Sequence, residues 1–170
     1  MAWWKSSISN WHRKLSTFLT LSRPEQTLLV KAWLFLPLIA AGLRLFGFRR
    51  CLRVMARLEN GVAAHDAEEV PPNGPALRTA RMVQLAARHG IVRPSCLERS
   101  LVLWWLLLQQ KMAASLRIGT RRQKDRIEAH AWVEMAGCVL NDSQDVGRRF
   151  RAFSGLAEAM RRQRAGRKPA

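Results

Sequence analysis

The spacing of apolar residues changes near residue 113, and this change restricts the fold more than any other feature of the sequence. Residues 96–112 carry leucine and tryptophan on more than one side of a helix, which is typical of a buried central helix. The residues that follow alternate in the manner of strands. The expected strands are 114–120, 128–135 and 138–142, with a polar insert at 121–126 between the first two. A helix followed by consecutive strands predicts an α+β fold, with a central helix packed on a small antiparallel sheet.

Upstream of this region the sequence predicts helices. Ser22 can cap a helix, Glu25 stands three residues on, and Pro24 suits the first turn. This helix should run from Arg23 to Phe46, with a kink at Pro37. Two further helices are expected at residues 49–58 and 76–89.

Residues 59–75 contain the clearest linker, because they combine Asn-Gly and Pro-Pro pairs with an acidic cluster. The predicted organisation is a helical N-terminal segment (1–60), a linker (61–75), a core (76–150) and a basic C-terminal helix or tail (151–170).

The net charge of +17 is concentrated at the two ends of the chain. Residues 1–50 carry eight basic side chains and one acidic, and residues 151–170 carry six and one. A hydrophobic content of 48% excludes a disordered basic tail protein. The basic ends are therefore either solvated or docked on an acidic partner, an anionic membrane or nucleic acid.

The sequence predicts neither secretion nor a membrane span. The most apolar stretch holds 12 uncharged residues between Lys31 and Arg44, whereas a spanning helix needs about 20. Tryptophans among basic residues, such as Trp11 and Trp33, also suit a helix on a membrane surface, although core packing is the simpler interpretation. Three cysteines form no disulfide framework, which favours a reducing, cytoplasmic location, with contact at the inner membrane face left open.

Three residues of the predicted core can form a nucleophilic site. Cys96 stands at the expected N-terminus of the central helix, where the helix dipole and free N–H groups favour a thiolate and stabilise an oxyanion. His130 lies on a predicted strand and Asp142 ends the next one. A nucleophile, a base and a carboxylate that orients the base are the parts of a catalytic triad.

The loop of the second hairpin decides whether His130 and Asp142 can meet. A three-residue loop, Met135-Ala136-Gly137, places His130 opposite Asp142 on one face of the sheet. A two-residue loop, Ala136-Gly137, places them on opposite faces. The three-residue loop is the expectation.

Other interpretations of these residues remain open. Cys138 should share a sheet face with His130, so a metal site of Cys96, His130, Cys138 and Asp142 is an alternative, although no paired Cys-x-x-Cys or His-x-x-x-His spacing supports it. Cys51 and Cys138 otherwise read as small buried hydrophobes. The other histidines have no evident partner, and the sequence holds no phosphate loop or dinucleotide fingerprint; these histidines are His12, His65 and His89.

Four segments of the chain, in order, resemble a known family. They are Cys96-Leu97-Glu98-Arg99-Ser100-Leu101, Arg117-Ile118-Gly119, Ala129-His130-Ala131-Trp132-Val133-Glu134 and Val139-Leu140-Asn141-Asp142. Together they cover roughly residues 78–145 and are similar to the transglutaminase-like cysteine peptidases of lasso peptide biosynthesis. These B proteins remove the leader from a ribosomally made precursor peptide. The stretch Leu21-Ser22-Arg23-Pro24-Glu25 and its apolar helix resemble the front part of the same family more weakly.

The resemblance implies a papain-like mechanism without a cofactor or metal. Cys96 matches the nucleophile, His130 the general base and acid, and Asp142 the carboxylate that orients the histidine. It also implies three partners, namely the precursor peptide, a leader-recognition protein and an asparagine-synthetase-like cyclase. Because residues 1–60 show no three-stranded pattern, the chain resembles the split form, in which the recognition protein is separate.

Two alternatives belong to other classes. One is a basic module that binds an anionic membrane or nucleic acid, which rests on the charge of +17. It leaves the ordered motifs of residues 96–142 unexplained, so no nucleic-acid partner is expected. The other is an inactive scaffold with the peptidase fold.

Overall fold

The computed structural model describes residues 20–47, 50, 54, 71–90, 92–123 and 126–152, which form helices packed against an antiparallel sheet. The described elements, in chain order, are α2 (Arg23–Phe46), α4 (Gly74–His89), α5 (Cys96–Gln109), β1 (Ser115–Gln123), β2 (Arg126–Met135), β3 (Cys138–Val139), α6 (Val146–Arg149) and β4 (Arg151–Ala152). This is the mixed architecture that the change of period predicts, a helical part followed by a small curled antiparallel sheet.

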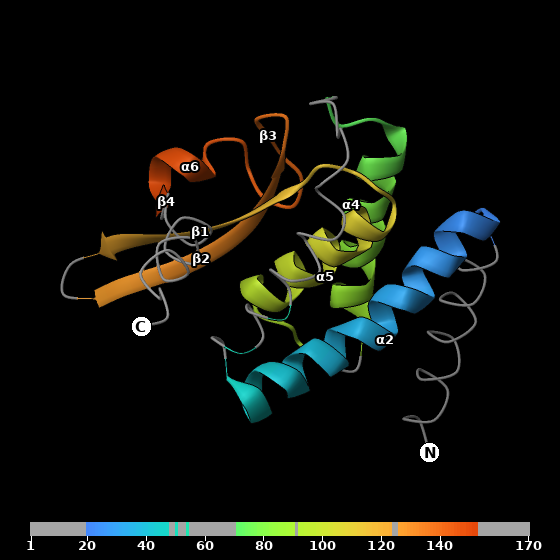
Figure 1. Ribbon diagram of the computed structural model, residues 1–170, viewed down its shortest axis with the longest axis horizontal. Coiled ribbons are helices and arrows are strands. Elements are labelled where there is room, and N and C mark those ends of the chain that lie inside the picture. The colour runs from blue at the N-terminus through green and yellow to red at the C-terminus, as the bar shows by residue number, and fades with distance from the viewer. Residues whose placement is uncertain are drawn as a thin grey trace, which may run out of the picture.

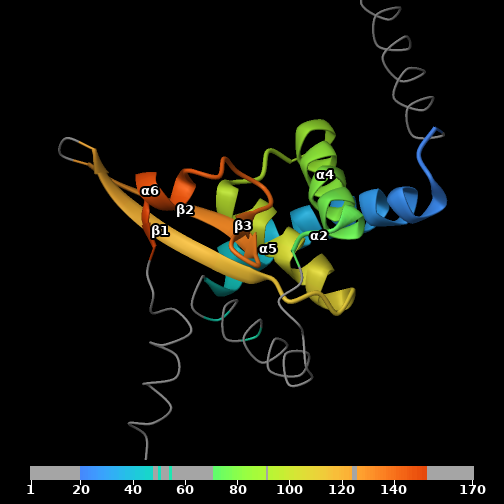
Figure 2. The same cartoon turned by 90° about the horizontal axis from the view of Figure 1, so that it is seen from above.

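Helix α5 lies at the centre of the molecule, between α2 and α4 on one side and the sheet on the other (Figure 1). Figure 2 shows the same layers from above, with α6 near β1 and β2 at the end of the sheet away from α4. Nine of the 14 residues of α5 are buried. The central, buried helix predicted from residues 96–112 is therefore confirmed.

Capping residues set the helix boundaries. The Glu25 carboxylate accepts a hydrogen bond from the Ser22 N–H at 2.9 Å, and α2 runs from Arg23 to Phe46 as predicted. Helix α4 begins two residues earlier than expected, because Asn73 Oδ1 accepts from the Ala76 N–H at 3.2 Å. Helix α5 ends at Gln109, before the predicted Met112, since Lys111 takes a positive φ of 58°.

The sheet has the strand order β3-β2-β1-β4. The ladder between β1 and β2 extends from Ser115↔Glu134 to Gln123↔Arg126. Most of the polar insert predicted at 121–126 is therefore paired strand. Both outer strands are short, and β4 pairs with β1 through Gly119↔Ala152 and Thr120↔Arg151.

The predicted three-residue loop after β2 is wrong. The pairs Met135↔Cys138 and Glu134↔Val139 leave a two-residue loop, Ala136-Gly137. Both loop residues have positive φ, 46° and 76°, as the tight type I′ hairpin turn requires. The third strand, predicted to reach Asp142, ends at Val139.

Two clusters of buried side chains lie on opposite faces of the sheet. The large cluster joins α2, α4 and α5 to the sheet face of Val133 and Met135. The small cluster lies on the other face; its members are Trp132, Val139, Val146 and Phe150.

Several sequence predictions fall outside the described residues. They concern the rest of the helix at 49–58, the linker up to residue 70, the tail from residue 153, and the side chains of Trp11, His12, Cys51 and His65.

Candidate active site

His130 and Asp142 lie in contact, with His130 Nε2 2.5 Å from Asp142 Oδ2. The contact does not depend on the predicted register. After β3 the Leu140 N–H still bonds to the Val133 carbonyl, and Asn141 Oδ1 then accepts from the Val133 N–H at 2.8 Å. This side-chain bond closes the end of the ladder, and the next residue, Asp142, reaches the His130 ring. His130 and Asp142 therefore meet because the chain leaves the sheet before it reaches Asp142.

The second oxygen of the Asp142 carboxylate is also held. Oδ1 accepts from the Ser143 N–H at 2.7 Å and lies 3.3 Å from Arg149 Nη2. Burial opposes ionisation of this carboxyl, but the hydrogen bonds from His130 and Ser143 outweigh burial, and the pKa of Asp142 lies below its ordinary value of 3.8. Asp142 is thus kept ionised and fixed in orientation, as a carboxylate that positions an imidazole must be.

Aromatic rings fix the plane of the His130 imidazole. Phe150 stacks on it with ring centroids 4.8 Å apart, and Trp132 lies 6.2 Å away, also stacked. The Arg121 guanidinium covers the Phe150 ring at 4.7 Å. The His130 side chain remains 20% exposed and Asp142 24%. With Nε2 directed at Asp142, Nδ1 is the ring nitrogen left for proton transfer to a substrate or a thiol.

Gly119 leaves room for these rings. It pairs with His130 across the ladder between β1 and β2. A Cβ atom here would lie 2.9 Å from Trp132 Cη2 and 3.1 Å from Phe150 Cβ. A side chain at residue 119 would therefore displace the two rings that pack on the imidazole.

Cys96 is the first residue of α5, as the sequence predicts. Ser95 caps the helix, and its N–H donates to the Glu98 carboxylate at 2.6 Å while its hydroxyl accepts from the Glu98 N–H at 3.3 Å. These two bonds leave the N–H groups of Cys96 and Leu97 without a hydrogen-bond partner among the described residues. The start of α5 thus offers donors that can stabilise a negative charge beside the thiol.

Hydrogen bonds connect α5 to the edge of β2, the strand that carries His130. The Ser100 hydroxyl donates to the Ala131 carbonyl at 2.9 Å, and Asn141 Nδ2 donates to Ser100 Oγ at 2.8 Å. Cys96 precedes Ser100 by one turn and lies on the same side of the helix. Its thiol makes no hydrogen bond to the His130 ring in the described part of the chain, so pairing of thiol and imidazole stays a prediction.

The register of β2 and β3 corrects the predicted position of Cys138 and with it the metal hypothesis. Cys138 pairs with Met135 and so lies on the face of the sheet opposite to His130, not on the same face as predicted. Among the described residues, no three His, Cys, Asp or Glu side chains are grouped closely enough to hold a metal ion. Cys96, His130, Cys138 and Asp142 therefore do not form a ligand set.

Sequence reasoning missed the residues that hold the pair in place. Arg149 and Phe150 belong to a segment without helical or strand periodicity, so no pattern marked them. Ser100 and Asn141 lie inside the motifs, yet only the hydrogen bonds to β2 reveal their role.

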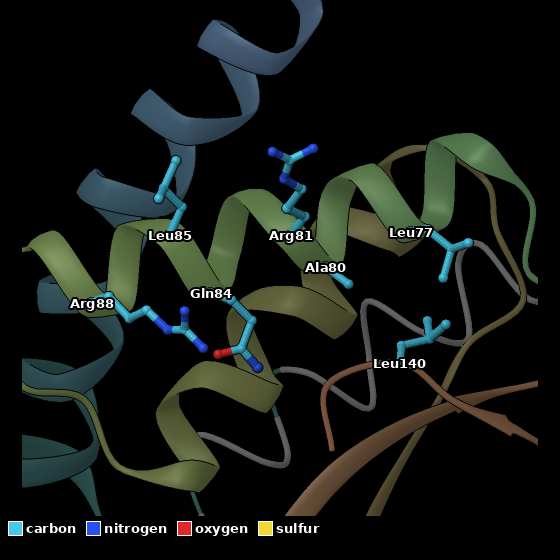
Figure 3. Close-up of a pocket in the computed structure, with 7 residues that line it drawn as sticks. All are labelled: Leu77, Ala80, Arg81, Gln84, Leu85, Arg88 and Leu140. Atoms are coloured by element: carbon cyan, nitrogen blue, oxygen red, sulfur yellow. The ribbon is translucent and has the colours of Figure 1, made fainter. Parts of the chain in front are cut away.

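An open hollow of about 500 Å³ lies between α4 and Leu140, the residue that follows β3. Figure 3 shows Leu77 pointing toward Leu140 there, while Arg81 points away from Leu140. Gln84 joins α4 to the turn before Asp142 through the Asn141 carbonyl, at 3.0 Å. The hollow is lined by none of Cys96, His130 or Asp142, so we assign it no function.

One comparison with known proteins identifies a family. The family model described as the transglutaminase-like superfamily matches residues 33–155, which contain Cys96, His130 and Asp142. Comparison with curated proteins and with solved structures gave no match.

Proposed function

Because the chain belongs to the transglutaminase-like superfamily, we propose that it is a cysteine peptidase that cleaves the leader from a lasso precursor peptide. The superfamily has a cysteine-protease-like fold, and its members generally have cysteine peptidase or transglutaminase activity. The observation that carries the proposal is the oriented contact between His130 and Asp142, on a strand whose edge is bonded to the helix that starts at Cys96.

In the proposed reaction the Cys96 thiolate attacks the carbonyl that joins leader to core peptide. The thiol proton passes to His130, which then donates it to the departing core amine. The leader remains on the sulfur as a thioester. His130 next takes a proton from water, the hydroxide adds to the thioester, and the leader acid and free thiol are restored. Asp142 fixes the imidazole and stabilises its protonated form.

The oxyanion of each tetrahedral intermediate needs hydrogen-bond donors. We assign this role to the N–H groups of Cys96 and Leu97, because the Ser95–Glu98 capping box occupies the neighbouring N–H groups. Donors fixed in a folded helix need no reorganisation during the reaction.

The lasso substrate is supported by the motifs of residues 96–142 and by their order. We propose the split form of these peptidases, in which a separate recognition protein presents the leader. An asparagine-synthetase-like cyclase then closes the released core peptide.

The test compares two cysteines in the same assay. Precursor peptide, recognition protein and each purified variant are incubated, and the products are measured by mass spectrometry. Cys96→Ala should abolish leader cleavage, and His130→Ala and Asp142→Ala should reduce it at least about 100-fold. Cys138→Ala is the matched control, because Cys138 lies on the face of the sheet away from His130. Cleavage by Cys96→Ala at the wild-type rate would refute the proposal.

The same reaction separates hydrolysis from acyl transfer and from an inactive scaffold. With an added primary amine, a transglutaminase forms an amide of the leader, whereas a peptidase releases the leader acid. A scaffold would show equal alkylation rates at Cys96 and Cys138 and no product of either kind.

A further inference from the structure

Helix α2 presents an apolar surface that the described part of the protein does not cover. We call this surface the outer face of α2; it consists of Val30, Leu34, Leu38, Leu45 and Phe46. These five side chains are between 46% and 77% exposed. Val30, Leu34, Leu38 and Leu45 follow one another at spacings of four and seven, so they form a stripe along the helix.

The opposite side of α2 packs into the protein core. Ala32, Leu36 and Ala40 are at most 3% exposed and pack toward α4 and α5. In Figure 1, α4 and α5 lie on only one side of α2. A contiguous apolar stripe on the solvent side costs solubility and commonly marks an interaction surface.

The charges around the stripe indicate the kind of partner. Lys31 and Arg44 are exposed on α2, and its one acidic residue, Glu25, is bound to Ser22 in the first turn. A second copy of the chain would bring another +17, which disfavours self-association. An anionic lipid surface offers both an apolar interior and negative headgroups.

We propose that the outer face of α2 docks on an anionic membrane surface. The helix axis lies in the plane of the membrane, its stripe of leucines enters the interface, and Lys31 and Arg44 meet lipid phosphates. This inference rests on the exposure and charge of α2 and is independent of the proposed peptidase activity.

The geometry favours lying on the membrane over crossing it. By length and composition α2 could cross a membrane, a test that core helices of soluble proteins also pass. If α2 crossed the membrane, its buried residues Ala32, Leu36 and Ala40 would have to leave the protein core. Lys31 and Arg44 are separated by about 20 Å along a helix axis, which is less than the roughly 30 Å of a hydrocarbon core. A spanning α2 would bury at least one of these charges.

Co-sedimentation of the full chain with vesicles tests the proposal. Vesicles of phosphatidylcholine with about one-third phosphatidylglycerol are compared with pure phosphatidylcholine. We expect binding to the anionic vesicles to be at least about tenfold stronger. Leu34→Ser/Leu38→Ser should weaken it about 10- to 100-fold at unchanged net charge, because two leucines leave the interface.

The matched control is Leu77→Ser/Ile127→Ser, which also removes two exposed apolar side chains but none on α2. It should bind within about twofold of wild type. Lys31→Gln/Arg44→Gln keeps the leucines and should lose about tenfold or more at low salt. Circular dichroism checks that each variant is folded.

Three results would overturn the proposal. The first is equal binding of Leu34→Ser/Leu38→Ser and wild type, which would assign binding to the basic ends of the chain. The second is no vesicle binding by wild type, or equal binding to neutral and anionic vesicles. The third is membrane-bound protein that resists alkaline carbonate extraction, which would indicate a spanning helix.

Discussion

Replacement of Gly119 by alanine should disturb His130 without touching it. The new Cβ would lie 2.9 Å from Trp132 Cη2, 3.0 Å from the Arg151 carbonyl oxygen and 3.1 Å from Phe150 Cβ. Non-bonded carbon atoms prefer about 3.5–4.0 Å, so both rings must move by roughly 0.5–1 Å. Because Phe150 and Trp132 stack on the His130 ring, the imidazole moves with them.

The expected loss of thermal stability and the expected loss of activity can be estimated separately. Overpacking of this kind costs about 1–3 kcal/mol, and for a chain of this size each kcal/mol lowers the Tm by about 2–4 °C. We therefore expect Gly119→Ala to lower the Tm by about 2–12 °C. A displacement of about 1 Å at a catalytic group can slow a reaction about 100-fold, so leader cleavage should fall further than the stability loss explains.

Gly147→Ala is the matched control. A Cβ atom at Gly147 meets nothing within 4 Å, and this glycine lies in α6. Alanine in a helix should leave the Tm unchanged or raise it slightly. Thermal unfolding by circular dichroism and leader cleavage below the transition measure both effects. A Gly119→Ala protein with wild-type Tm and rate would refute the packing argument, as would an equal loss in Gly147→Ala.

Three further changes test the contacts around the site. The pKa of Asp142 lies below 3.8 in the folded protein, so wild type should exceed Asp142→Asn in free energy of unfolding by the full amount above about pH 5. This difference should shrink as the pH falls through the lowered pKa. Urea unfolding of both proteins between pH 3 and pH 6 measures the difference, and a difference that stays constant contradicts the prediction. Ser100→Ala removes the buried hydrogen bonds to Ala131 and Asn141 and should lower the free energy of unfolding in urea by about 1–3 kcal/mol. A decrease of less than about 0.5 kcal/mol would contradict this prediction. Ser95→Ala should cost about 1 kcal/mol whereas Ser95→Asp, which keeps a cap, should cost little; equal losses would exclude a capping role.

The sequence predicted best where local chemistry decides the structure. The Ser22–Glu25 capping box and the apolar helix behind it define α2 to the residue. The change of apolar period near residue 113 correctly separates helix from sheet. Both signals lie within a few residues of the structure they produce.

Prediction failed where a single residue adopts an unusual backbone conformation. Ala136 takes a positive φ that alanine seldom adopts, and this one residue changes the loop from three residues to two. The change moved Cys138 to the other face of the sheet. The contact between His130 and Asp142 nevertheless forms, because Asn141 ends the ladder. The prediction of a contact was therefore right and its geometric reason wrong.

The C-terminal part of the site carries no periodic signal. Strand β4 has two residues and α6 has four, too few for any pattern to be recognised. Phe150 is placed against His130 only by the tertiary packing of the small cluster.

The residues of the proposed site pack against two buried clusters that differ in size, and we expect the two regions to differ in local stability. Cys96 belongs to a helix anchored in the large cluster, whereas His130 packs against the small cluster of four buried residues. Regions with few buried contacts open locally at a lower free energy than the whole domain unfolds. We expect amide protons near Val146 and Phe150 to exchange faster than those in α5. On warming, the packing of Phe150 on His130 should then loosen while the helix of the nucleophile is still folded, so inactivation should precede global melting.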